Sequence, residues 1–258
     1  MDPASIIGIV VAFGAVFTLV ILEGGSIGEM FLVAPLLLVF GGTLGVALAG
    51  GLLKDMTGMF GSLKDALMTK VQPPDALLAD IVKLAEKARR EGLLALEDGM
   101  RDVENEFLRK GLQLAVDGTD QDELQDILEA EVEAKRKHDK VNAKILADMG
   151  AYAPTVGIVG TTLGLINALA NLSEPEKLGH LIASAFVATL WGLLSANMMW
   201  LPLSAKIKRV SEYEATQMEL VIAGIVNIQS GANPRLVGQK LRSMLPPGTA
   251  PADEKKAA

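Results

Sequence analysis

The chain has 258 residues, half of them apolar, and its mean hydropathy of +0.35 is typical of a membrane protein. Its net charge of −7 gives no reason to expect nucleic acid as a partner. The absence of cysteine excludes a disulfide framework and a cysteine-ligated metal site, and the two histidines lie far apart in the sequence. We therefore expect membrane helices, one moderate soluble domain, and no resident metal or cofactor.

The N-terminal segment, residues 1–53, is predicted to form a membrane hairpin. Residues 3–22 and 30–53 carry no charge, and each run is long enough to cross a hydrocarbon core of about 30 Å as a helix. Neither a basic residue before the first run nor a small-residue cleavage site is evident. We therefore interpret the first run as an uncleaved helix rather than a signal peptide.

The central segment, residues 54–148, is predicted to be a soluble helical domain. Apolar residues recur at helical spacing over 54–70, and this helix either continues the preceding membrane helix or lies at its cytoplasmic mouth. Further helices are expected over 76–88 and 93–114, separated by a charged break. From Asp122 a charged helix is expected to run without interruption into the next membrane segment.

A second membrane hairpin is predicted over 149–205, where two charge-free runs flank the short break at 174–177. Each run places small residues on one helix face, which lets another helix approach closely. Each of these faces also carries one hydroxyl. The hydroxyls either bond back to their own helices or together form a polar path. The two faces consist of Gly157, Thr161, Gly164 and Ala168, and of Ala185, Thr189, Gly192 and Ala196.

The C-terminal segment, residues 206–258, should continue the last helix, break near 230–235, and form one more short helix. Its final residues, 248–258, are predicted to be disordered. Lysine and arginine are concentrated in this tail and in the central domain, and the two short hairpin loops hold only one such residue. The distribution predicts that the N-terminus, the central domain and the C-terminus face the cytoplasm.

The expected fold is thus an all-α membrane protein. Four transmembrane helices form two hairpins, and a helical cytoplasmic domain lies between the second and third of them. Pro154 and Pro202 fall in the third and fourth membrane helices, where each removes a helix hydrogen bond and permits a kink. The kinks are either static bends or hinges.

Four stretches in this order resemble the MotA/PomA family of flagellar motor stator subunits, and the resemblance covers essentially the whole chain. It implies a ring of five copies around two copies of a MotB or PomB partner, which supplies an ion-binding aspartate. It also implies that ion flow turns the ring and applies torque to the rotor protein FliG. The stretches are KARREGLLALED at 87–98, YAPTVGIVGTTLGLI at 152–166, LGHLIASAFVATLWGLLSAN at 178–197 and SGANPRLVGQKLRSMLPP at 230–247.

The resemblance implies roles for individual residues. Thr161 and Thr189 match hydroxyl positions that line the ion path, and sodium-driven relatives tend to have Thr where Thr161 stands. No predicted membrane helix carries a central carboxylate, and Asp148 lies at a membrane edge, so another chain must supply the ionisable group. Because hydroxyl and carbonyl oxygens suit a hard cation, sodium is favoured over the proton as the transported ion. Pro154 and Pro202 match the family's prolines and would act as hinges.

The resemblance also implies a contact with the rotor. Relatives use an Arg and a Glu at the spacing of Arg89 and Glu97, and here Arg90 and Asp98 are charged neighbours. Complementary charges would allow fast, reversible engagement. Without the resemblance, these four residues would simply form a solvated helix face.

Three other functions compete with this one. An ExbB/TolQ-type energy-transducing subunit also works by an ion-driven mechanism. Those proteins have three membrane helices, whereas four are predicted here. A channel or secondary transporter lacks support because no inverted repeat or intramembrane charge is visible. A scaffold without ion flux is opposed only by the Thr-bearing faces. The glycines at 157 and 160 lie inside a membrane span and there is no phosphate-binding loop or catalytic triad, so an enzyme is not expected.

Overall fold

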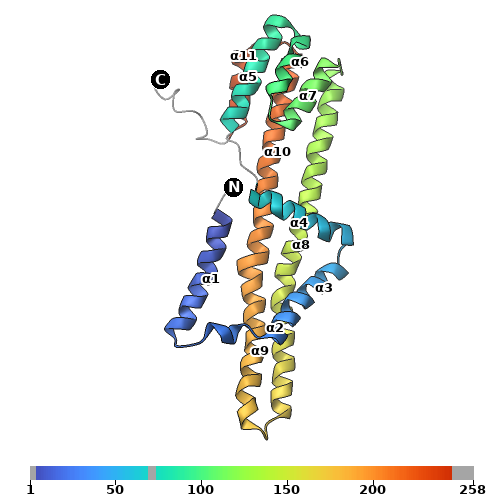
Figure 1. The fold of residues 1–258 in the computed structure, drawn as a ribbon. Helices are drawn as coiled ribbons and strands as arrows, with labels where there is room; N and C mark the ends of the chain where they lie inside the picture. Colours follow the sequence, from blue (N-terminus) through green and yellow to red (C-terminus); the bar gives the residue numbers. More distant parts are fainter. Residues whose placement is uncertain (1–3, 69–73, 246–258) are drawn as a thin grey trace. The chain divides into compact units, whose positions relative to one another are not determined.

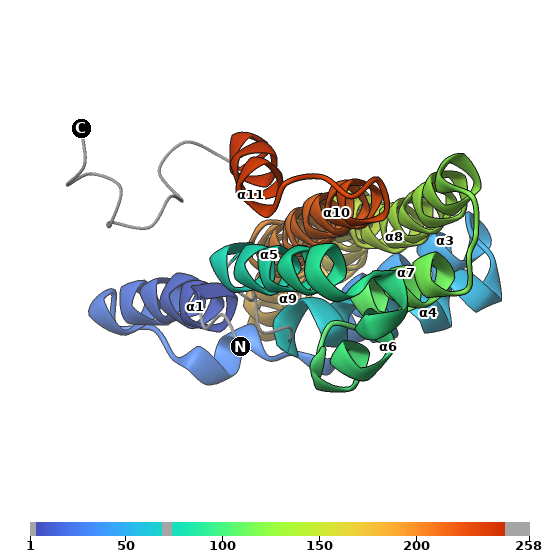
Figure 2. The ribbon, with the colours of Figure 1, turned by 90° about the horizontal axis from the view of Figure 1, so that it is seen from above.

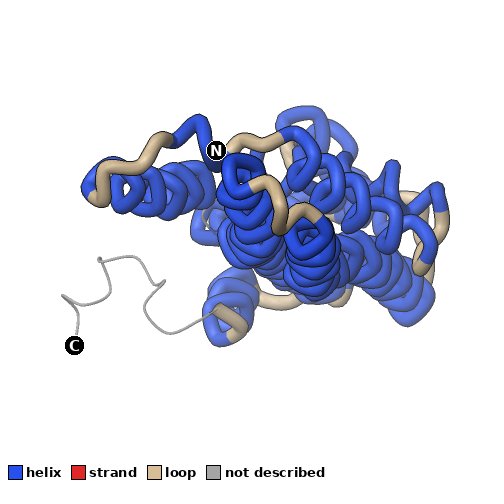
Figure 3. Tube along the Cα trace, turned by 90° about the horizontal axis from the view of Figure 1, so that it is seen from below, coloured by secondary structure: helices blue, strands red, loops and turns tan. Residues whose placement is uncertain are grey.

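The computed structural model describes residues 4–68 and 74–245, and this part of the chain consists of helices joined by short loops, with no strand (Figures 1 and 3). The expected all-α fold is therefore confirmed. The predicted disorder of 248–258 lies outside the described residues. Contacts divide the chain into two compact units: Met1–Thr69 with His138–Val210, and Lys70–Lys137 with Ser211–Ala258. The predicted borders near 53, 148 and 205 concern the membrane surface and stay predictions.

The first unit contains the apolar helices. Three helices are long and apolar enough to cross a membrane, and the pair Val33–Ala49 and Leu53–Met68 provides a fourth candidate with a bend of 119° between its members. The elements are α1 (Ala4–Leu22), the 3₁₀ turn η1 (Ile27–Met30), α2 (Val33–Leu36), the π-helical turn η2 (Leu37–Gly41), α3 (Gly42–Ala49), α4 (Leu53–Met68), and parts of α8 (Gln121–Ala170) and α10 (Leu201–Gln229), with α9 (Pro175–Ser195) and the π-helical η5 (Ala196–Trp200) between them.

The bend between α3 and α4 decides between the two predicted positions of the 54–70 helix. Gly50 and Gly51 separate the two helices, and α4 turns sharply away instead of continuing the membrane helix. One face of α4 is buried through Met56 and Met59, while Phe60 on the other face is exposed. The bend therefore excludes a straight continuation of the preceding helix, and the position of α4 at the mouth of the span stays a prediction.

The second unit has its own apolar core. Leu112 of α7, Leu124 and Leu128 of α8, Ile225 of α10 and Leu241 of α11 are almost completely buried together. In this unit α5 and α11 lie side by side (Figures 1 and 2). Its further elements are α5 (Pro74–Glu91), η3 (Leu93–Ala95), α6 (Leu96–Gly99), η4 (Met100–Asp102), α7 (Glu106–Val116) and α11 (Pro234–Ser243), together with the charged portions of α8 and α10.

Two helices predicted from the sequence have different outcomes in the structure. The uninterrupted helix expected from Asp122 into the membrane is confirmed as α8, which has 50 residues. The single helix expected over 93–114 is wrong, because short 3₁₀ and α turns occupy 93–102 and α7 begins afresh at Glu106. The Asn105 side chain accepts a hydrogen bond of 2.9 Å from the Leu108 backbone N–H. This N-cap stabilises a new helix start and explains the break.

Candidate functional site

The crossing of α8 and α9 is so close that side chains are excluded from it. A Cβ added at Gly157 would lie 2.8 Å from the Ala188 carbonyl oxygen, and one added at Gly192 would lie 2.7 Å from the Ala153 carbonyl oxygen. Both blocking atoms belong to the backbone, which cannot swing aside. Glycine at these two positions therefore lets the two helix backbones touch.

The contact continues along both small faces. A Cβ at Gly164 would lie 2.6 Å from the Ala185 Cβ, and one at Gly160 would lie 2.7 Å from the Ala188 Cβ. The sequence predicted that each face would accept a close neighbour, and the structure shows that the two faces accept each other. The hairpin is thus held together by its own glycines and alanines.

The two predicted hydroxyls meet at this crossing. Thr161 Oγ1 and Thr189 Oγ1 are hydrogen-bonded to each other. Thr161 Oγ1 also lies 3.0 Å from the Ala185 carbonyl oxygen and 3.2 Å from that of Gly157, and Thr189 Oγ1 lies 3.5 Å from the same Gly157 oxygen. Two hydroxyl and two carbonyl oxygens are therefore gathered in one place, and the bond between the helices adds to the back-bond that Thr161 makes within α8.

This oxygen cluster has a limited chemistry. Thr161 and Thr189 are half-buried, so the cluster can be reached from one side of the hairpin. Uncharged oxygens can replace part of the hydration shell of a hard cation, but they cannot neutralise its charge. An ion that passes here needs a counter-charge, and residues 149–173 and 178–205 contain no carboxylate.

The carboxylate nearest to this region along α8 is already paired. Asp148 accepts a hydrogen bond of 2.6 Å from Lys144 one turn earlier. This hydrogen bond and the charge of Asp148 raise the pKa of Lys144, so the charged form of the lysine is favoured. An exposed ion pair at the edge of the apolar run is suited to marking the membrane surface rather than to carrying ions.

The two prolines occupy different surroundings. Pro154 lies inside α8 at the tight crossing, and a Cβ at Gly192 would lie 3.3 Å from its Cα. Pro202 is the second residue of α10, just after the π-helical turn η5, which loosens the hydrogen-bond ladder where proline supplies no N–H. Pro202 is exposed and lines a cavity of about 310 Å³, together with Asn197 and with Gly8 of α1.

The four predicted rotor-contact residues lie at one end of the second unit. Arg89 and Arg90 are in the last turn of α5, and Glu97 and Asp98 are in α6, which packs against α5. All four are exposed. The turn between them requires Gly92, whose φ of +87° is unfavourable for other residues.

Comparison with known proteins places the chain in a family. Residues 100–220 match the model of the MotA/TolQ/ExbB proton channel family. Motility protein A of Bacillus subtilis is 36% identical, with 95% of this chain and 92% of that protein covered. Chemotaxis protein PomA of Vibrio alginolyticus is 32% identical, with coverage of 96% and 97%. The chain belongs to the motility protein A family.

Solved structures agree with this membership of the motility protein A family. The C. jejuni MotAB structure aligns with a TM-score of 0.91 at 30% identity, covering 98% of this chain and all of the matched chain. The flagellar MotAB stator complex from Bacillus subtilis aligns with a TM-score of 0.89 at 35% identity, covering both chains completely. This motility protein A family member is accordingly a multi-pass inner-membrane protein and not an enzyme.

An aromatic cluster lies near the site in this motility protein A family member, and no sequence pattern predicts it. The Trp191 indole N–H donates a hydrogen bond of 2.6 Å to the Met30 carbonyl oxygen, and both residues are buried. The ring centroid of Trp191 lies 5.3 Å from that of Phe31, 5.9 Å from that of Phe40 and 6.2 Å from that of Phe13. These contacts fasten the first hairpin to α9 two residues beyond Thr189. These residues are far apart in the sequence. Apolar aromatic residues in a membrane helix are equally compatible with a lipid-facing surface, so their sequence does not predict the cluster.

The charged end of α5 and α6 also carries an exposed apolar side chain. Leu94 lies between the two pairs of charged residues and is 74% exposed. The helix predicted over 93–114 gives no sign that Leu94 is an apolar side chain facing solvent. An exposed leucine flanked by Arg90 and Glu97 adds an apolar contact to a charged surface.

Proposed function

We propose that this chain is the stator subunit of a bacterial flagellar motor, acting with a MotB/PomB-type partner as an ion channel that drives rotation. The observation that carries the proposal is the hydroxyl pair of Thr161 and Thr189, enclosed between two membrane helices without a carboxylate. The two relatives described above are named motility protein A and chemotaxis protein PomA, and the matched solved structures are MotAB complexes.

Because the hairpin contains no carboxylate, the partner subunit must supply the charged group that binds the ion. Two copies of the partner, each with one membrane helix, supply the ion-binding aspartate next to the oxygen cluster. Five copies of this chain form a ring around them. An ion held between the partner's aspartate and the Thr161 oxygen is both neutralised and partly solvated, which permits entry and release.

Sodium is the favoured ion over the proton. Hydroxyl and carbonyl oxygens are suitable ligands for a hard cation, and Thr161 and Thr189 gather such oxygens at one place. A proton would need only the aspartate and its water. An Ala at position 161 would remove both one ligand and the bond that links the two hydroxyls.

Torque would reach the rotor through the second unit. Arg89, Arg90, Glu97 and Asp98 present both signs of charge on an exposed surface, which suits a rotor protein such as FliG with alternating charges. Pro154 and Pro202 would act as hinges that relate ion occupancy to the movement of this surface. Pro202 has a cavity beside it into which the helix can bend.

The orientation follows from the distribution of basic residues. The N-terminus, the central domain and the C-terminal tail are in the cytoplasm, and the loops at 23–29 and 172–180 are outside. This places the charged residues of α5 and α6 on the side of the rotor. An ExbB/TolQ-type role is the alternative. Its support is limited to the family model over residues 100–220, whereas motility protein A of Bacillus subtilis and PomA of Vibrio alginolyticus match over more than nine tenths of the chain.

Complementation tests the proposal. Cells that lack their own stator should swim when they express this chain together with its partner. Swimming should be lost without the partner, and also with a partner whose membrane aspartate is replaced by asparagine. Swimming that persists with the asparagine partner would refute the proposed channel. Rescue of an ExbB- or TolQ-deficient strain, without rescue of swimming, would support the alternative.

A further inference from the structure

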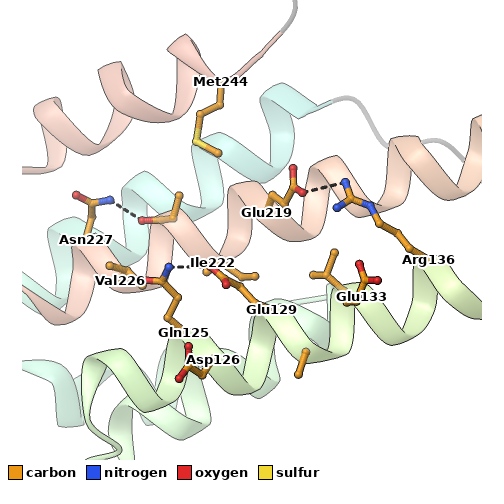
Figure 4. Close-up of a pocket in the computed structure, with 13 residues that line it drawn as sticks. Gln125, Asp126, Glu129, Glu133, Arg136, Glu219, Ile222, Val226, Asn227 and Met244 are labelled. Carbon is orange, nitrogen blue, oxygen red and sulfur yellow. Dashed lines mark hydrogen bonds and ion pairs between the residues drawn. The ribbon is translucent and has the colours of Figure 1, made fainter.

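The second unit carries a groove of about 850 Å³ between α8 and α10 that the proposed function leaves unused (Figure 4). Ile222 and Val226 of α10 line it together with Met244, which follows α11. Met244 is 44% exposed, whereas Ile222 is buried. The groove thus offers apolar surface with an opening to solvent.

The sides of the groove are acidic. Asp126, Glu129 and Glu133 project from α8 and Glu219 from α10 (Figure 4). Among the lining residues that the structure describes, Arg136 is the only basic one. Its guanidinium is already paired with Glu219 at 2.9 Å and with Glu212 at 3.4 Å, and Glu133 has an exposed partner in Lys137 at 3.5 Å. After these pairings the groove retains an excess of negative charge.

Lipid cannot cover this apolar surface. The lining portion of α8 carries a charged residue on nearly every turn, so it lies outside the hydrocarbon core. The exposed apolar residues of α1 are different, because that helix is apolar throughout and long enough to span a bilayer. An exposed apolar groove in a charged domain is the kind of surface that another protein covers.

Helix α11 presents the complementary chemistry. Its sequence, PRLVGQKLRS, contains three basic residues and no acidic one. Val237 and Leu241 face the core of the second unit, whereas Leu236 is 52% exposed beside the exposed Arg235. The first turn of α11 therefore presents one basic and one apolar side chain, Arg235 and Leu236, which match an acidic groove with an apolar floor.

The two surfaces lie at separate places on the same chain. Lys240 donates a hydrogen bond of 3.0 Å to Asn227, a lining residue, so the C-terminal part of α11 is fastened beside its own groove. Arg235 precedes Met244 by nine residues, which corresponds to about 13.5 Å along a helix at 1.5 Å per residue. Arg235 and Leu236 are thus exposed at the end of α11 opposite to the one beside its own groove.

We propose that the groove receives the Arg235–Leu236 end of α11 from a second copy of this chain. The contact is heterologous, because one copy supplies the groove and the other supplies the helix end. Heterologous contacts close into rings when the rotation between copies permits it. The proposal rests on the proposed ring-forming function, and it names the surfaces in the cytoplasmic unit that join neighbouring copies.

Cysteine cross-linking tests the contact directly, because the native chain contains no cysteine. Asp126→Cys, Glu129→Cys and Glu133→Cys would each be combined with Arg235→Cys in the complete complex in membranes. Oxidation should yield a ladder of covalent oligomers for at least one pair, since a disulfide requires Cα atoms within about 7 Å. Separate groove and helix variants mixed in one membrane should give dimers only.

The controls distinguish the contact from random collision. Arg101→Cys, another exposed arginine of this unit, replaces Arg235→Cys as the matched control and should give no ladder. No ladder from any of the three pairs, or cross-links only to a protein of different mass, would overturn the proposal. Swimming of cells that express the cysteine-free chain with its partner tests the proposed function separately. Swimming cells that give no ladder would refute only the contact.

Discussion

Replacing Gly157 by alanine tests the close crossing of α8 and α9 most sharply. The new Cβ would lie 2.8 Å from the Ala188 carbonyl oxygen and 3.1 Å from the Thr189 Cα, whereas ordinary contacts begin near 3.4 Å. The helices must therefore separate by about half an ångström or more. Overpacking of this kind costs about 1–3 kcal/mol.

This separation should affect function as well as stability. Gly157 supplies a carbonyl oxygen to the cluster, and the new Cβ would press on the Thr189 Cα, so the two hydroxyls would move apart. The expected results are a lower unfolding temperature of the purified complex and swimming slowed more than the stability loss explains. The matched control is Gly45→Ala in α3, where the new Cβ would have no neighbour within 4 Å. Equal stability and speed for the two variants would refute the crossing geometry.

Three further changes test the assigned residues. Thr161→Ala or Thr189→Ala should reduce rotation several-fold with assembly intact, and Thr161→Ser should retain it; full motility of both alanine variants would contradict the ion-path role. Arg89→Glu or Glu97→Lys should lower swimming speed but leave ion flux through the complex unchanged, whereas unchanged speed in both would exclude a rotor contact there. Pro154→Ala should stabilise α8 by restoring a hydrogen bond and still slow rotation, and normal rotation would leave only a static bend.

The sequence predicted the parts of this fold that depend on local patterns. The continuity of α8 followed from the lack of any breaker between Asp122 and the membrane run, and Pro154 did not interrupt it. The break before α7 was missed, although Asn105 is a typical N-cap residue, because apolar spacing across 93–114 suggested one helix. The bend after α3 lies at Gly50 and Gly51, inside the uncharged run 30–53 that predicts one continuous membrane helix.

The site required three-dimensional information. Small residues at spacings of three and four predicted that the faces around Thr161 and Thr189 would accept a helix, but spacing cannot say which helix. In the structure the two faces pack against each other, which brings the two hydroxyls into contact. The bond from Trp191 to Met30 is likewise a property of the assembled unit, because neither residue has a sequence signal for the other.

Rotation speed as a function of external sodium at constant pH tests the central claim most directly. Tethered cells that lack their own stator would express this chain with its partner. The account predicts a speed that rises with sodium, is insensitive to a protonophore, and loses its sodium dependence in Thr161→Ala. A speed that is indifferent to sodium and abolished by the protonophore would contradict it, and would leave the hydroxyl pair with a role in packing α8 against α9.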